Sequence, residues 1–95
     1  MPPVRLVVTI NAASGRGSDL ATAMQPRLAE VRTEPGCEQY ELFRSTERPD
    51  ILVLLERWAG ETALEAHSAL NRTRTPMAPE LRAAPGKLER YVITE

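Results

Sequence analysis

The side chains best suited to acid–base chemistry lie close together in the middle of the chain: Glu56, Trp58 and His67. His67 is the single histidine, and an imidazole exchanges protons near neutral pH with little tuning by its surroundings. Trp58 would give a pocket a flat apolar wall with one N–H donor. Glu56 could orient the imidazole or act as a base in its place. This stretch therefore predicts a site for proton transfer, with His67 as its natural base.

Each of these residues also has a purely structural interpretation, which stays open at this point. A histidine on the apolar stripe of a helix is often a packed residue with a satisfied hydrogen bond. Trp58 suits a core or a subunit interface as well as a pocket, and Glu56 suits an ion pair with an arginine of a neighbouring strand. Arg72 and Arg74, farther along the chain, belong most simply to a solvated loop.

The strands that would carry this stretch are marked by composition. Pro35-Gly36 predicts a turn, because proline fixes φ and glycine accepts a left-handed φ. A strand is expected over residues 37–44 and a hairpin connection over residues 45–50. The apolar run over residues 51–55 predicts a central strand that ends in the Glu-Arg-Trp segment. These two strands should pair antiparallel.

Two helices are expected around these strands. Apolar residues recur at the spacing of one helical face between residues 20 and 31, which predicts a helix over residues 18–33. Pro26 falls inside this helix and predicts a kink or an irregular first turn. The segment from Thr62 to Glu65 follows a capping-box pattern, so a second helix should begin at about Thr62. His67 then belongs to the buried stripe of that helix or to its border.

The order of the elements predicts the fold. Residues 4–11 alternate as a first strand and residues 87–94 as a last one. Thr75-Pro76 predicts the start of a short helix that runs to about Ala84 and is ended by Pro85-Gly86. The result is β-α-β-β-α-(α)-β, which predicts a single domain over residues 1–95 with a ferredoxin-like α+β fold. Four antiparallel strands would carry helices on one face only.

The other face of this sheet predicts an oligomer. The first and third strands carry apolar side chains on both faces, which indicates that neither face is left to water. A second subunit's sheet is the simplest cover. Two such sheets that face each other across a dyad would form a dimeric α+β barrel, and we expect a homodimer.

Bulk composition excludes several partners. The chain has 95 residues, a net charge of −1 and arginines scattered singly among acids, so no basic stripe exists that could follow a nucleic-acid backbone. A single cysteine excludes an internal disulfide. No stretch approaches the length of a transmembrane helix. We expect a cytoplasmic protein that binds neither nucleic acid nor membrane.

Three motifs give the chain a family resemblance. They are Glu34-Pro35-Gly36-Cys37-x-x-Tyr40, Glu56-x-Trp58 and Leu64-x-x-His67. With the order of elements they resemble the antibiotic biosynthesis monooxygenase domain, and are most similar to its quinol monooxygenase-like members. This resemblance implies oxidation of an electron-rich quinol or polycyclic phenol with O2, without metal, flavin or haem.

The resemblance also implies roles for single residues. His67 would take the proton of a bound phenol beside Trp58, while Asn11 or Arg82 would hydrogen-bond a phenolate or a developing peroxide oxygen. We expect Tyr40 and Leu54 to contact the substrate. Leu54 and Leu64 stand where the polyketide-tailoring members carry an asparagine and a tyrosine, and the histidine that ligates iron in haem-degrading members has no counterpart after the second helix.

Two other functions fit the same scaffold. One is an isomerase or decyclising enzyme that uses His67 for proton transfer and consumes no oxygen. The other is a non-catalytic dimer that binds a small aromatic ligand. Similarity of fold does not separate these functions, because function depends on the site.

Overall fold

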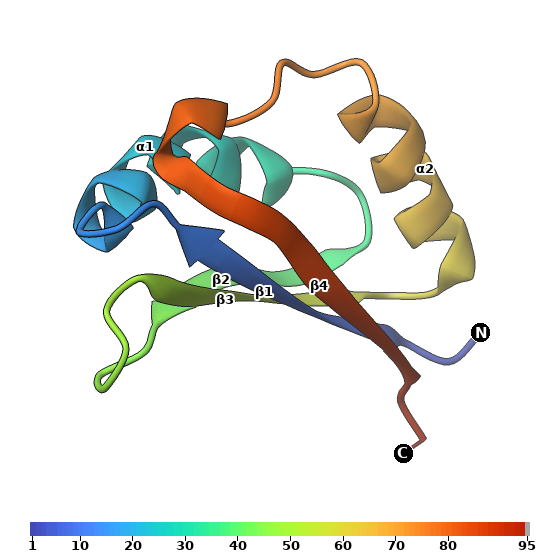
Figure 1. Ribbon diagram of the computed structural model, residues 1–95. Helices are drawn as coiled ribbons and strands as arrows, with labels where there is room; N and C mark the ends of the chain where they lie inside the picture. Colours follow the sequence, from blue (N-terminus) through green and yellow to red (C-terminus); the bar gives the residue numbers. More distant parts are fainter. Residues whose placement is uncertain (95) are drawn as a thin grey trace.

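The four strands form one antiparallel sheet, and both helices lie on the same side of it (Figure 1). This computed structural model describes residues 1–94. None of the helices described is long and apolar enough to cross a membrane. The elements are β1 (Val4–Ala12), α1 (Gly17–Val31), β2 (Cys37–Arg44), β3 (Ile51–Trp58), α2 (Glu61–Asn71), a short 3₁₀ helix η1 (Pro79–Leu81) and β4 (Arg82–Val92).

The sheet has the strand order β2-β3-β1-β4, which confirms the ferredoxin-like α+β fold. β3 and β1 lie in its centre and pair antiparallel, so that Val4 faces Trp58 at one end and Asn11 faces Ile51 at the other. β2 pairs antiparallel with β3, as the hairpin pattern predicts. The predicted bounds of β2 are confirmed, while β3 extends through the Glu-Arg-Trp segment to Trp58.

Helix α1 supplies much of the hydrophobic core. Its stripe of Leu20, Met24, Leu28 and Val31 is at most 1% exposed, because residues three and four apart share one helical face. The helix begins one residue before its predicted start and continues through Pro26. The core that it covers is formed by the side of β1 and β3 that carries Leu6, Ile10, Leu52 and Leu54.

Helix α2 begins one residue before its predicted start, but without the predicted cap. It starts at Glu61, and Gly60 precedes it without any side-chain cap. The N–H of Leu64 donates to the Gly60 carbonyl and closes the first turn, so Thr62 lies inside the helix and the capping-box prediction is wrong. Glu61 places an acid in the first turn, where the helix dipole favours negative charge.

The predicted helix from Pro76 to Ala84 is wrong. Only the three residues Pro79–Leu81 are helical, and β4 begins directly after them at Arg82. Two prolines in this segment lack an N–H to donate. Ala78, between them, has a φ of 40°, a left-handed conformation that a helix does not continue through.

Pro85-Gly86 lies inside β4 instead of ending a helix. The pairing of β4 with β1 shifts between Thr9 and Asn11, next to this dipeptide. β4 is an edge strand, where a proline without an N–H is tolerated. A Cβ at Gly86 would lie 2.7 Å from the Thr9 carbonyl oxygen, so the close approach of the two strands requires glycine.

The face of the sheet opposite the helices carries apolar side chains as well. Val7, Val53 and Leu55 are half-buried on it, and Phe43 on β2 is 45% exposed. No segment of the described chain covers this face (Figure 1). We call it the outer sheet face.

Candidate active site

His67 and Trp58 stack on each other under α2. Their ring centroids lie 4.4 Å apart at an interplanar angle of 28°. Trp58 ends β3 fully buried, and His67 on the second turn of α2 is 6% exposed. Tyr40 of β2 meets His67 edge-on at a centroid distance of 5.6 Å and Trp58 at 6.4 Å. Three elements far apart in the chain thus build one aromatic cluster, formed by Tyr40, Trp58 and His67.

The Glu34 carboxylate contacts the imidazole of His67. Its Oε1 lies 2.9 Å from His67 Nδ1, and the two side chains are 9% and 6% exposed. A carboxylate can only accept, so in the neutral imidazole the hydrogen lies on Nδ1 and the lone pair on Nε2. The Glu34–His67 pair therefore fixes both the orientation of the ring and the nitrogen that can take a proton.

The turn after α1 brings Glu34 to this position. Gly36 has a φ of 80°, and a Cβ built on it would lie 2.5 Å from the Ala63 Cβ. Only glycine allows the turn to pack this closely against α2. The predicted turn is confirmed. It places Glu34 beside His67.

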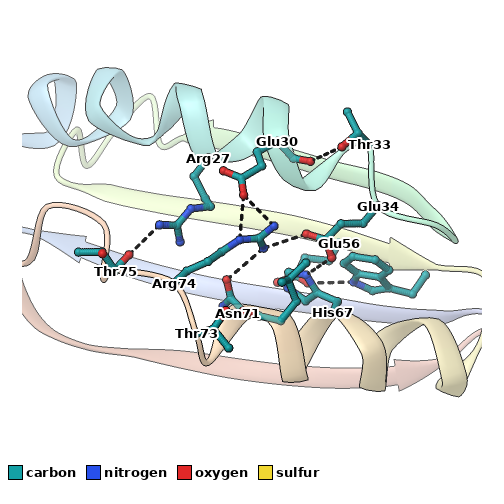
Figure 2. A network of polar contacts seen from close by, with 12 residues as sticks. Arg27, Glu30, Thr33, Glu34, Glu56, His67, Asn71, Thr73, Arg74 and Thr75 are labelled. Carbon is teal, nitrogen blue, oxygen red and sulfur yellow. Dashed lines mark hydrogen bonds and ion pairs between the residues drawn. The ribbon is translucent and has the colours of Figure 1, made fainter.

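Arg74 continues the network beyond Glu34 (Figure 2). Its Nη1 lies 2.8 Å from Glu34 Oε2, and its Nη2 lies 3.0 Å from Glu30 Oε1. The Arg74 side chain is 10% exposed, so its interpretation as part of a solvated loop is wrong. Glu34 Oε2 accepts no hydrogen bond from the described residues, which makes its contact with Arg74 an ion pair with poor hydrogen-bond geometry.

Glu56 is buried beneath the aromatic cluster. It is 5% exposed and accepts a hydrogen bond of 2.9 Å from Trp58 Nε1. Among the described residues 1–94 it forms no ion pair with an arginine. Burial raises the pKa of the Glu56 carboxyl, and Glu34 adds to this, while the Trp58 bond and His67 oppose it. Burial also raises the pKa of the Tyr40 hydroxyl, with Glu56 and Glu34 adding to the effect. The site thus combines an imidazole with two groups, the Glu56 carboxyl and the Tyr40 hydroxyl, whose pKa values are raised.

Cys37 does not add a nucleophile to the site. Burial raises the pKa of its thiol, and the carboxylates of Glu34 and Glu56 raise it further. The thiolate is the nucleophilic form, so this environment disfavours it, and the half-buried Cys37 packs against the core.

His67 lines two separate hollows. The larger, which we call the α2 cleft, has a volume of about 580 Å³ and lies between the turn over residues 34–36 and α2. Its walls are mostly apolar, and its polar side chains are Glu34, Thr62 and His67. The smaller, the β4 groove, has a volume of about 280 Å³ and is lined by Glu56 and His67 together with Leu6, Leu64 and Leu88.

The structure brings together most of the residues expected from the sequence. The site is formed by His67, Trp58, Glu56 and Tyr40. Leu54 is buried two residues before Glu56 on β3, where it pairs with Val8 and Leu42.

Asn11 and Arg82 lie elsewhere. Asn11 pairs with Ile51, at the end of the β1–β3 ladder opposite Trp58. Arg82 pairs with Ala12 at that same far end and lines a different pocket.

Sequence reasoning missed the roles of Glu34 and Arg74. Glu34 stands in the first of the three motifs, but its partner His67 is 33 residues away. The residues next to Arg74 in the sequence do not indicate that it is buried, because it stands in a polar loop with other charged residues. Within residues 1–94, no group of three or more histidine, cysteine, aspartate or glutamate side chains is arranged to hold a metal ion.

The fold and this site define a small α+β domain with a buried acid–imidazole pair beside an apolar cleft. Residues 3–78 match the family model described as antibiotic biosynthesis monooxygenase. The chain belongs to this family.

Solved structures show the same fold along nearly the whole chain. PA3566 of Pseudomonas aeruginosa is 26% identical with a TM-score of 0.81, covering 100% of this chain and 97% of its own. Rv0793 of Mycobacterium tuberculosis is 26% identical with a TM-score of 0.78, covering 98% and 96%. A Caulobacter crescentus protein is 22% identical with a TM-score of 0.82, covering 99% and 92%. No curated protein matches the chain.

Proposed function

We propose that this protein is a cofactor-independent monooxygenase that oxidises a quinol or polycyclic phenol with O2. Membership of the family supports the reaction class. The observation that carries the proposal is the Glu34–His67 pair, stacked on Trp58 and lining an apolar cleft. This arrangement offers a base on the wall of an apolar hollow, with the ring of Trp58 buried behind that base.

Oxidation of a phenol by O2 without a cofactor requires few groups from the protein. A phenol becomes a strong electron donor once it is deprotonated, so the enzyme must bind it, take its proton and keep water away. His67 Nε2 accepts the phenolic proton, and the Glu34 carboxylate at Nδ1 stabilises the imidazolium that forms. In an anthrone-like substrate the ring CH₂ becomes a carbonyl. One atom of O2 enters that carbonyl and the other leaves as water with both hydrogens.

The α2 cleft is the hollow that suits such a substrate. Its volume of about 580 Å³ falls in the range of small-molecule sites. Pro35, Ala63, Ala66 and Leu70 line it and would contact a planar ring system. The β4 groove has about half this volume, so we assign the substrate to the α2 cleft.

The test is oxygen uptake by metal-stripped protein with a panel of quinols and anthrone-like phenols. We expect uptake stoichiometric with quinone formation, and a loss of about 10² to 10⁴ in turnover for His67→Ala. Glu65→Ala, on the same helix, is the matched control and should keep the wild-type rate, because Glu65 is exposed and lines neither hollow. No uptake above the spontaneous rate with any member of the panel would contradict the proposal.

A second function, an isomerase, is favoured by one observation. Glu56, whose carboxyl pKa is raised, lines the β4 groove together with His67, so a proton could be taken by one group and returned by the other. Exchange of a substrate C–H for deuterium under anaerobic conditions, without oxygen uptake, would support this function over the monooxygenase.

We also propose that the protein acts as a homodimer joined through the outer sheet face. The half-buried side chains of Val7, Val53 and Leu55 and the exposed Phe43 support this assembly, because apolar sheet faces of this kind pack against a second layer. Sedimentation at micromolar concentration should give a dimer mass for the wild type and a monomer mass for Val53→Lys. A monomeric wild type would contradict it.

A further inference from the structure

Three arginines from different elements line a further pocket beside α2. Arg27 comes from α1, Arg74 from the loop after α2 and Arg82 from the start of β4, and the pocket has a volume of about 400 Å³. We propose that this arginine pocket binds a small organic anion, namely a carboxylate on a flat apolar body. The site is separate from the aromatic cluster and does not depend on the proposed oxidation.

Two of the three positive charges are not neutralised. Arg27 Nη2 donates to the Thr75 carbonyl at 2.7 Å, and Arg82 Nε donates to the Met77 carbonyl at 3.1 Å. Within residues 1–94, neither guanidinium forms an ion pair with a carboxylate, whereas Arg74 has both Glu30 and Glu34. A guanidinium has five N–H donors, so Arg27 and Arg82 keep donors for a ligand.

The pocket is held in shape by the loop between α2 and η1. Thr75 and Met77, whose carbonyls fix the two arginines, belong to this loop (Figure 2 shows Arg27 at Thr75). The left-handed Ala78 follows directly, and the N–H of the buried Leu81 donates to its carbonyl. Donors fixed in advance lose less entropy when a ligand binds.

The rest of the lining indicates the kind of anion. Pro76, Met77 and Pro79 give the pocket an apolar wall, and Asn71 and Thr75 add polar groups. Guanidinium groups bind carboxylates through two parallel hydrogen bonds. An inorganic phosphate would leave the apolar wall uncovered, while a carboxylate on a ring would use both parts of the lining.

The pocket adjoins the candidate active site through two residues. Asn71 lines both the arginine pocket and the β4 groove. Arg74 lines the pocket and forms the ion pair with Glu34, which in turn holds His67. An anion bound here therefore sits one side chain away from the Glu34–His67 pair.

The test is an NMR titration of ¹⁵N-labelled protein with benzoate, benzamide and inorganic phosphate. We expect benzoate to shift the amide signals of Thr75, Met77 and Arg82 saturably, and to bind at least tenfold more tightly than either other probe. Arg27→Gln and Arg82→Gln should each weaken benzoate about tenfold, because each removes a charge-assisted hydrogen bond. Arg48→Gln, in the exposed hairpin, is the matched control and should bind as the wild type does.

Three results would overturn the proposal. Benzamide binding as tightly as benzoate would show that the charge is not recognised, and phosphate binding as tightly would show that the apolar wall is not used. Unchanged affinity in both arginine variants would place the ligand elsewhere. The amide spectrum of each variant reports its fold in the same experiment. The two substitutions lie on separate elements, so if one variant fails to fold, the other still tests the proposal.

Discussion

The two helices lie on the same face of the sheet but contribute to the protein in different ways. α1 buries four large apolar side chains almost completely, whereas the buried residues of α2 are only Leu64 and His67. The exposed or half-buried positions of α2 that line the α2 cleft include the small residues Ala63 and Ala66. Thus α1 closes the core, while α2 leaves room beside a buried polar network. We infer that stability depends mainly on α1 and the proposed chemistry on α2.

The largest effect expected on stability is from a truncation in α1. Met24→Ala should lower the free energy of unfolding by about 2 to 5 kcal/mol, because it removes a fully buried side chain and leaves a cavity. Leu70→Ala on α2, where the side chain is 45% exposed, is the control and should cost well under half as much. Urea unfolding measures both, and equal losses would contradict the division between the helices.

Next in size is the effect of Glu34→Gln on activity. The amide still accepts a hydrogen bond from His67 Nδ1 but no longer stabilises an imidazolium, so turnover should fall roughly ten- to a hundredfold. Glu30→Gln is a matched control, since it also removes a carboxylate from Arg74 but does not contact His67. Equal rates for these two variants in oxygen uptake would mean that Glu34 acts only in packing.

A substitution that fills the α2 cleft should change KM by about tenfold. Ala66 is exposed and lines this cleft but not the β4 groove, so Ala66→Phe should raise KM by roughly tenfold without unfolding α2. Ser68→Val changes the β4 groove instead. A larger rise in KM for Ser68→Val would move the substrate to the β4 groove.

The smallest effect is the dependence of stability on pH through Glu56. Burial raises the pKa of its carboxyl above the usual 4.5, so the folded state holds this proton more tightly than the unfolded state. The contribution to stability is complete below pH 4.5 and is lost as pH rises through the raised pKa. Glu56→Gln should flatten this decline and unfold at higher urea concentration than the wild type at neutral pH. A curve parallel to that of the wild type would contradict this account, and exposed Glu41→Gln serves as the control.

The sequence predicts the parts of this comparison that depend on local pattern. The stripe of α1, the bounds of β2 and the place of His67 on α2 follow from periodicity and from the Pro35-Gly36 break, because each is set by neighbouring residues. The partners of His67 do not follow in this way. Glu34 and Arg74 look solvated in the chain and become buried only because a glycine turn and a loop meet beneath α2. The helix predicted over residues 76–84 is wrong, because the prolines of this segment and the left-handed Ala78 stop the helix that its composition suggests.

The most direct test of the central claim is whether the site deprotonates its substrate before oxygen reacts. An anthrone-like phenol should be mixed with the protein under anaerobic conditions, and the absorbance of its anion followed below the pH at which the free phenol ionises. The account predicts a bound anion with the wild type and none with His67→Ala at equal occupancy. An anion of the same intensity with His67→Ala would contradict the assignment of His67 as the base.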